Sequence, residues 1–103
     1  MSNTSTLTVI GWRDIPAQVV AAHGRSKVRV ELSPRFQAAI DRAAMQAGLI
    51  GTDEYLEHWT RLSRDCADDL ESEARAEAER LERAYDRPRL ERLIAAAGIE
   101  EDT

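Results

Sequence analysis

The sequence predicts an α+β fold, in which a small antiparallel β-sheet of two or three strands packs on two helices. Two observations predict it. The first part of the chain contains short runs of β-branched residues, and the run at residues 27–32 alternates strictly between charged and apolar side chains. Farther along, apolar residues recur at three- and four-residue spacing, which is the period of amphipathic helices. With 103 residues and 43% of them apolar, the chain is large enough for one small core.

Three strands account for the first part of the chain. Residues 6–12 form the first, and Pro16 favours a turn or bend after it, because proline lacks an N–H and biases the preceding residue toward extended geometry. Residues 18–22 fit a strand better than a short helix, since residues 23–26 then make a hairpin turn into the next run. That run, residues 27–32, is the third strand, with its valines and Leu32 facing the core.

A helix follows the strands. Ser33 is expected to be its N-cap, Pro34 its first residue, and Gly48 the residue just beyond its end. Thr52 is then expected to cap a second helix, which begins at Asp53. These two helices would complete the core against the sheet.

The second helix is expected to continue as an extended acidic helix that leaves the domain. Its apolar stripe consists of Tyr55, Leu56, Trp59, Leu62, Cys66 and Leu70. Past Leu70 the stripe thins mainly to alanines among Glu and Arg, so this stretch has little to bury. The sequence around Pro88 ends it, and a short final helix stops at Gly98. The predicted organisation is therefore an α+β core over residues 1–66 and an acidic helical extension over residues 67–103.

Charge and cysteine content exclude several classes of protein. The net charge is −5, with a basic excess in residues 1–50 and a larger acidic excess in residues 51–103, which argues against a general nucleic-acid binder. The apolar runs are only a few residues long, so no membrane association is expected. The single cysteine, Cys66, excludes an internal disulfide framework. A free cysteine and the lack of a recognisable signal peptide predict a cytoplasmic protein.

The sequence contains no constellation that predicts catalysis. His23 and His58 lack the spacing of a metal site, and no glycine-rich phosphate loop is present. Cys66 falls on the apolar stripe between acidic residues that would raise the pKa of its thiol, so it is expected to be inert. We therefore expect no catalytic residue, no metal and no cofactor.

The run from Trp12 to Gln18 is the most distinctive stretch. An indole, a guanidinium, a carboxylate and an amide lie together at a strand end, which suggests a partner-binding surface made of Trp12, Arg13, Asp14 and Gln18. A structural interpretation stays open beside it. In that interpretation Trp12 covers the core, and Asp14 caps the turn and pairs with Arg13.

The arginines of the basic half suggest another kind of site. Arg25, Arg29, Arg35 and Arg42, together with Arg13, could meet the anionic tail of a small ligand such as a folate. A further alternative is a self-associating protein, in which the basic half of one copy meets the acidic half of another.

Three runs together carry a family resemblance. They are residues 8–20 (TVIGWRDIPAQVV), residues 28–36 (VRVELSPRF) and residues 39–45 (AIDRAAM), followed by Gly48. Over about residues 6–66 the chain resembles the small virulence factor domain family. Family members often carry an aromatic residue before the tryptophan, where this chain has Gly11.

The resemblance implies an accessory or adaptor role and assigns no catalytic residue. Stand-alone members tend to be encoded among genes of tetrahydrofolate- and corrinoid-linked one-carbon metabolism, and larger members join the domain to an iron–sulfur module and helical repeats. Our leading hypothesis is therefore a non-catalytic accessory subunit that docks on a larger metabolic enzyme, with a small-ligand-binding module and a homo-oligomer as the alternatives. Neither nucleic acid nor a membrane is expected as a partner.

Overall fold

The computed structural model describes residues 4–100 as a four-stranded antiparallel β-sheet with helices packed against it. The strands are β1 (Ser5–Trp12), β2 (Ile15–His23), β3 (Ser26–Glu31) and β4 (Trp59–Cys66). Their order across the sheet is β3-β2-β1-β4, so β3 and β4 are the edges. The α+β prediction is confirmed, but the sheet has four strands instead of two or three.

The hairpin of β1 and β2 contains a β-bulge, because the pairing shifts after Ile10. Gly11 lies at the bulge and pairs with Pro16. A Cβ at Gly11 would lie 2.4 Å from the carbonyl oxygen of Ile15, so the close approach of the two strands leaves no room for a side chain. The sequence predicts a turn or bend around Pro16 and a strand from residue 18, whereas β2 already begins at Ile15.

Helix α1 (Pro34–Gln46) follows β3 as the sequence predicts, and Gly48 adopts a φ of 74° just beyond it. Ser33 does occupy the N-cap position, but its side chain makes no capping hydrogen bond. Its backbone N–H and its hydroxyl donate instead to the carboxylate of Glu82, at 2.6 and 2.8 Å. The start of α1 is therefore held by a later helix and not by its own cap.

The prediction of one long helix from Asp53 is wrong. Helix α2 (Asp53–Glu57) is short, and Thr52 caps it by accepting the N–H of Tyr55 at 3.3 Å. The chain then becomes β4, which pairs with the whole of β1, from Ser5 opposite Cys66 to Trp12 opposite Trp59.

Pairing with β1 explains why these residues form a strand. Without β4, the outer edge of β1 would expose a row of unpaired N–H and C=O groups. The spacing of Trp59, Leu62 and Cys66 fits a helix, whereas in the observed strand Leu62 and Arg64 lie on one face of the sheet and Ser63 lies on the other. Sequence pattern alone favours the helix, and pairing with a partner distant in sequence decides for the strand.

Helix α3 (Leu70–Ala84) corrects the expectation of an acidic helix that leaves the domain. It lies across β2 and β3 and buries Ala74, Ala78 and Leu81. The alanines that made its apolar stripe look thin are small enough to bring the helix close to the sheet, and most of its charged residues face outward. The helix is thus part of the fold.

Helix α4 (Arg87–Ala95) begins at the predicted break. The carboxylate of Asp86 accepts the N–H of Arg89 at 3.0 Å, and Pro88 lies in the first turn, where its missing N–H costs nothing. The helix packs against α1 and is followed by Gly98, with a φ of 89°. The predicted short final helix is confirmed.

A single hydrophobic core joins the sheet to α1, α3 and α4. Its members are Leu7, Trp12, Ile15, Val19, Ala21, Leu32, Phe36, Ala39, Ile40, Ala43, Ala44, Leu49, Ala74, Ala78, Leu81, Leu90, Leu93 and Ile94. Residues 1–66 and 67–103 both contribute to this core. No helix within residues 4–100 has the length and apolar character needed to cross a membrane.

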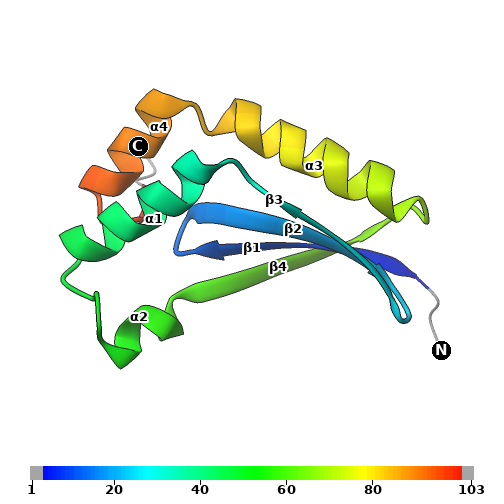
Figure 1. Ribbon diagram of the computed structural model, residues 1–103, viewed down its shortest axis with the longest axis horizontal. Helices are drawn as coiled ribbons and strands as arrows, with labels where there is room; N and C mark the ends of the chain where they lie inside the picture. The colour runs from blue at the N-terminus through cyan, green and yellow to red at the C-terminus, as the bar shows by residue number, and fades with distance from the viewer. Residues whose placement is uncertain (1–3, 101–103) are drawn as a thin grey trace.

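The helices α1, α3 and α4 lie on the same side of the sheet, and α2 lies beyond the end of β4 (Figure 1). Directly opposed residues of antiparallel strands share a face, so the register assigns the two faces. Leu7 and Val9 lie on the face toward the helices. The opposite face, here called the open face, is mainly polar. It carries Thr6, Thr8, Ile10, Gln18, Val20, Ala22, Lys27, Arg29, Glu31, Arg61, Ser63 and Asp65.

Candidate functional site

The turn between β1 and β2 holds the most distinctive residues of the sequence, beginning with Trp12. Its side chain has 0% exposure, and its Nε1–H donates to the carbonyl oxygen of Tyr55 at 2.8 Å. The indole also stacks on the ring of Tyr55 with centroids 5.6 Å apart. Trp12 therefore fixes α2 against the core and presents no surface to a partner.

Arg13 and Asp14 fasten this turn to the end of the chain. Arg13 has a φ of 52°, its backbone N–H donates to His58 at 2.9 Å, and its guanidinium donates to the carbonyl oxygen of Ala97 at 2.8 Å. Asp14 donates its N–H to the carbonyl oxygen of Gly98 at 2.9 Å, and its carboxylate accepts the N–H of Glu100 at 2.7 Å. The structural interpretation is thus correct for Trp12, which is buried in the core, but Asp14 pairs with the backbone of Glu100 and not with Arg13.

Gln18 does not join these three residues. It lies on β2 between Ile10 and Glu31, on the open face, and is half-buried. The structure therefore places the four expected partner-binding residues at two separate locations.

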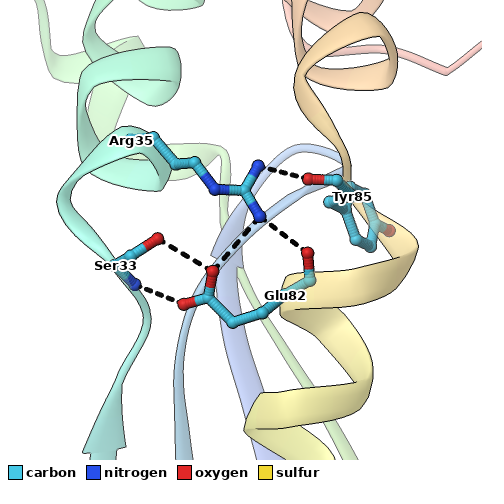
Figure 2. A network of polar contacts seen from close by, with 4 residues as sticks. All are labelled: Ser33, Arg35, Glu82 and Tyr85. Carbon is cyan, nitrogen blue, oxygen red and sulfur yellow. Dashed lines mark hydrogen bonds and ion pairs between the residues drawn. The ribbon is translucent and has the colours of Figure 1, made fainter.

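The four arginines proposed for anion binding lie on different elements, and two of them already have carboxylate partners. Arg35 donates to the carboxylate of Glu82 at 3.2 Å, to the carbonyl oxygen of the same residue at 2.7 Å, and to the carbonyl oxygen of Tyr85 (Figure 2). Arg42 pairs with Glu91 across α1 and α4 at 3.0 Å.

Arg25 and Arg29 are exposed, the first at the tip of the hairpin between β2 and β3 and the second on β3. The four side chains therefore line no common site, and two of them hold helices together.

Sequence reasoning missed a groove that lies over β1 and β4. Adjacent strands are about 4.8 Å apart and packed helices about 8–10 Å apart, so one helix covers about two strands. Because α3 packs mainly on β2 and β3, the helix-side face of β4 stays uncovered, and its residues Thr60, Leu62 and Arg64 are exposed beside the buried Leu7 of β1. A groove of about 550 Å³ occupies this place. No signal in the sequence indicates the groove, because residues 60–65 contain one apolar side chain, Leu62, and therefore no alternation between polar and apolar residues.

The floor of the groove is apolar. It is formed by Leu7 and Val9 of β1 and by Leu62 of β4, which lies opposite Val9. Leu62 is 73% exposed, the largest exposed fraction among the large apolar side chains that the structure describes. Its exposure in a concave surface marks the groove as a place where a ligand or a partner could gain apolar contact.

The wall of the groove carries a buried carboxylate that holds two arginines. Glu77 of α3 has 7% exposure, and Arg80 donates to it twice, at 2.9 and 2.6 Å. Arg64 of β4 approaches the same carboxylate at 3.6 Å from across the groove. The hydrogen bonds from Arg80 lower the pKa of Glu77 below its ordinary value, although burial opposes them. The side chains of Arg64 and Arg80 remain more than half exposed.

Tyr85 closes one end of the groove, near the turn residues Arg13 and Asp14. The guanidinium carbon of Arg89 lies 3.8 Å from the centre of its ring, and Arg89 pairs with Glu100 at 2.6 Å. Burial raises the pKa of Tyr85 above its ordinary value, so the phenol stays protonated and neutral at pH 7. The groove thus combines an apolar floor, a cationic wall and an aromatic end.

Metal ligation and cysteine chemistry have no support in this site. Within residues 4–100 there is no group of three or more His, Cys, Asp or Glu side chains placed to hold a metal ion. Cys66 ends β4 and is half-buried, and burial, followed by the charge of Glu73, raises the pKa of its thiol.

Comparison with known proteins identifies the family. No curated protein and no solved structure matches the chain significantly. The model of the family described as "Virulence factor" matches residues 10–94. The match extends beyond the resemblance seen in residues 6–66 and adds α3 and most of α4. The chain therefore belongs to the virulence factor family.

Proposed function

We propose that this chain is a non-catalytic accessory subunit that docks on a larger enzyme, and that the groove over β1 and β4 is the docking surface. The observation that carries the proposal is the exposure of Leu62, 73%, on a sheet face that α3 leaves half covered. An apolar side chain on the floor of a groove favours a partner that removes it from water.

The expected gain from docking is appreciable for so small a surface. Burial of one leucine side chain contributes about 1.5–3 kcal/mol. The guanidiniums of Arg64 and Arg80 are already oriented by Glu77, so less side-chain entropy would be lost when they meet a carboxylate of a partner. A protein surface with an apolar centre flanked by acidic residues would complement the groove.

The class of enzyme is part of the proposal. The family resemblance favours an enzyme of tetrahydrofolate- or corrinoid-linked one-carbon metabolism, and the proposed subunit would accompany it in the cytoplasm. Arg13 and Asp14 border one end of the groove, so a docked protein would also lie close to the turn that the sequence singled out.

Affinity capture with matched variants tests this proposal. The tagged chain, its Leu62→Ser variant and its Leu56→Ser variant would be expressed in the native cell and their bound proteins identified and quantified. Leu56 is 66% exposed and does not line the groove, so it is the control. We expect one stoichiometric enzyme with the parent chain and with Leu56→Ser, and its loss with Leu62→Ser. Equal capture by both variants would contradict the groove assignment, and the absence of any stoichiometric enzyme would contradict the accessory function.

A small amphipathic anion is the second candidate ligand, and the position of Arg64 and Arg80 beside an apolar floor favours it. The groove volume of about 550 Å³ is within the usual range for ligand pockets, about 300–1,000 Å³. A folate or a corrinoid-type carboxylate would place its ring on the floor and its acid on the arginines.

Titration of a folate, followed by calorimetry and thermal unfolding, tests the second candidate. Binding should raise the unfolding temperature of the parent chain and of Arg25→Gln, but not that of Arg80→Gln. If neither heat nor a thermal shift accompanies the titration, the groove does not bind this class of ligand.

A further inference from the structure

We propose that two copies of this chain pair through their β4 strands into one continuous antiparallel sheet, with a two-fold axis through Ser63. This inference concerns the edge of the sheet and does not depend on the proposed function, which concerns the groove above its face. The occupant of the edge is a second copy of this chain.

The edge of β4 is available for pairing. The strand pairs with β1 on one side only, and every residue from Thr60 to Asp65 is exposed. Its pairing with β1 runs through without a bulge, and it contains no proline, so its outer N–H and C=O groups form a regular row.

Two-fold symmetry restricts how two β4 strands can meet. An axis that relates antiparallel edge strands stands perpendicular to the sheet, so the helix layers of both copies lie on the same side. Each residue must then face a residue of the same sheet face in the other copy. The axis consequently passes midway between the two copies of one β4 residue, which then face each other. Moving the axis by one residue gives a different set of opposed side chains.

The charges of β4 select the axis at Ser63. This register places Arg61 opposite Asp65 of the other copy, and symmetry produces the pair twice on the open face. Neither Arg61 nor Asp65 has an ion-pair partner among the described residues, so both are free to form it. An axis at Arg61 or at Arg64 would oppose two guanidiniums, and an axis at Leu62 would leave the charges uncompensated.

The same register accounts for the helix-side face. Leu62 would lie opposite Arg64 of the other copy, whose aliphatic stem would cover part of a side chain that is 73% exposed in the single chain. The guanidinium of Arg64 already leans toward Glu77, at 3.6 Å, and so away from the strand edge. The new strand extends the plane of the sheet, and the grooves of the two copies stay open above it.

Sedimentation equilibrium of the full chain with charge variants tests the pairing. We expect a mass twice the 11.5 kDa of one chain and a dissociation constant raised about tenfold or more by Arg61→Asp or by Asp65→Arg, because each opposes like charges twice. An equimolar mixture of these two variants should form a heterodimer with an Asp–Arg pair at both ends, and the double variant Arg61→Asp/Asp65→Arg should restore the homodimer. The control is Arg29→Asp, an equal charge change on the other edge strand.

Two results would overturn the proposal. One is a monomer at every concentration up to about 100 μM, with circular dichroism showing a folded chain. The other is a dimer that responds equally to Arg61→Asp and to the Arg29→Asp control.

Cysteine cross-linking tests the register independently of affinity. In a Cys66→Ser background, Ser63→Cys places one thiol on each side of the proposed axis at the distance of opposed residues, and mild oxidation should link the two copies. Leu62→Cys should link much less, since the proposed register separates the two positions along the strand. Faster linkage through position 62 than through position 63 would show the wrong axis.

Discussion

The guanidinium of Arg13 donates to the carbonyl oxygen of Ala97 at 2.8 Å, so a turn near the start of the chain is fastened to the segment after the last helix. The same guanidinium lies 4.9 Å from the centre of the Trp12 ring. This single side chain therefore connects the first hairpin, the core tryptophan and the end of α4.

Replacement of Arg13 by alanine should destabilise the fold by about 2–3 kcal/mol. The change removes a charge-assisted hydrogen bond and a cation–π contact, and these two contacts no longer stabilise the left-handed backbone conformation at this position. The control is Arg29→Ala on the exposed face of β3, which should cost no more than about 0.5 kcal/mol. Urea unfolding curves of the two variants measure the difference, and similar midpoints would contradict the role given to Arg13.

Alanine at Gly98 should be more damaging than alanine at Gly24, although both glycines have positive φ angles, 89° and 58°. A Cβ at Gly98 would lie 3.0 Å from the Trp12 ring and 3.3 Å from Arg13, whereas a Cβ at Gly24 would have no neighbouring heavy atom within 4 Å. We expect the free energy of unfolding to fall by about 1 kcal/mol for Gly24→Ala and by about 2–4 kcal/mol for Gly98→Ala. Thermal unfolding of both variants decides, and equal losses would show that backbone conformation alone matters.

Acid should weaken the tie between α3 and β4 that Glu77 forms. The pKa of Glu77 in the folded chain lies below its ordinary value of 4.5, because Arg80 donates hydrogen bonds to it. A carboxyl whose pKa falls on folding stabilises the protein above pH 4.5, and this contribution is lost as the pH falls through the folded value. Glu77→Gln should thus be less stable than the parent chain at pH 7 and show a smaller loss of stability on acidification.

Glu79→Gln is the control for this pH dependence, since Glu79 is exposed on the same helix. Its stability between pH 7 and pH 3 should follow that of the parent chain. If Glu77→Gln gave the same curve as Glu79→Gln, the buried carboxylate would contribute nothing to acid sensitivity.

Serine at Leu62 should leave the stability of the single chain almost unchanged. Leu62 is 73% exposed, so the substitution removes little buried surface, and we expect a change within about 0.5 kcal/mol. Leu81 lines the same groove but has 4% exposure, and Leu81→Ser should cost about 3 kcal/mol or more. Chemical denaturation at low protein concentration separates the two, and a large loss for Leu62→Ser would mean that this side chain belongs to the core.

Local signals predicted much of the fold. The alternation of residues 27–32, the Ser33–Pro34 start and the Gly48 end each correspond to an observed boundary within one or two residues. These features depend on neighbouring residues, and local chemistry is sufficient for them. Alternation also indicated correctly that Val28 and Val30 pack toward the core.

The features that the sequence did not reveal depend on distant contacts. β4 forms a strand because its backbone pairs with β1, and α3 packs on the sheet because its alanines allow close approach. Neither reason can be read from the residues of the segment itself. The groove follows from both facts and so could not be anticipated. The run from Trp12 to Gln18 has unusual chemistry, but the sequence leaves open whether Trp12 lies at a surface or covers the core, and its burial and its hydrogen bond to Tyr55 decide for the core.

The pairing of β1 with β4 also sets the order in which this chain can fold. Of the residues that pair between β1 and β4, Trp12 and Trp59 are the closest in sequence, and even they are separated by two strands and two helices. Their pairing must therefore overcome the entropy of closing a long loop. The meander of β1, β2 and β3 needs only short turns and can assemble first. During synthesis on the ribosome, the outer edge of β1 would then wait for β4 to emerge, and this interval is when the nascent chain would most need protection from strand pairing with its neighbours.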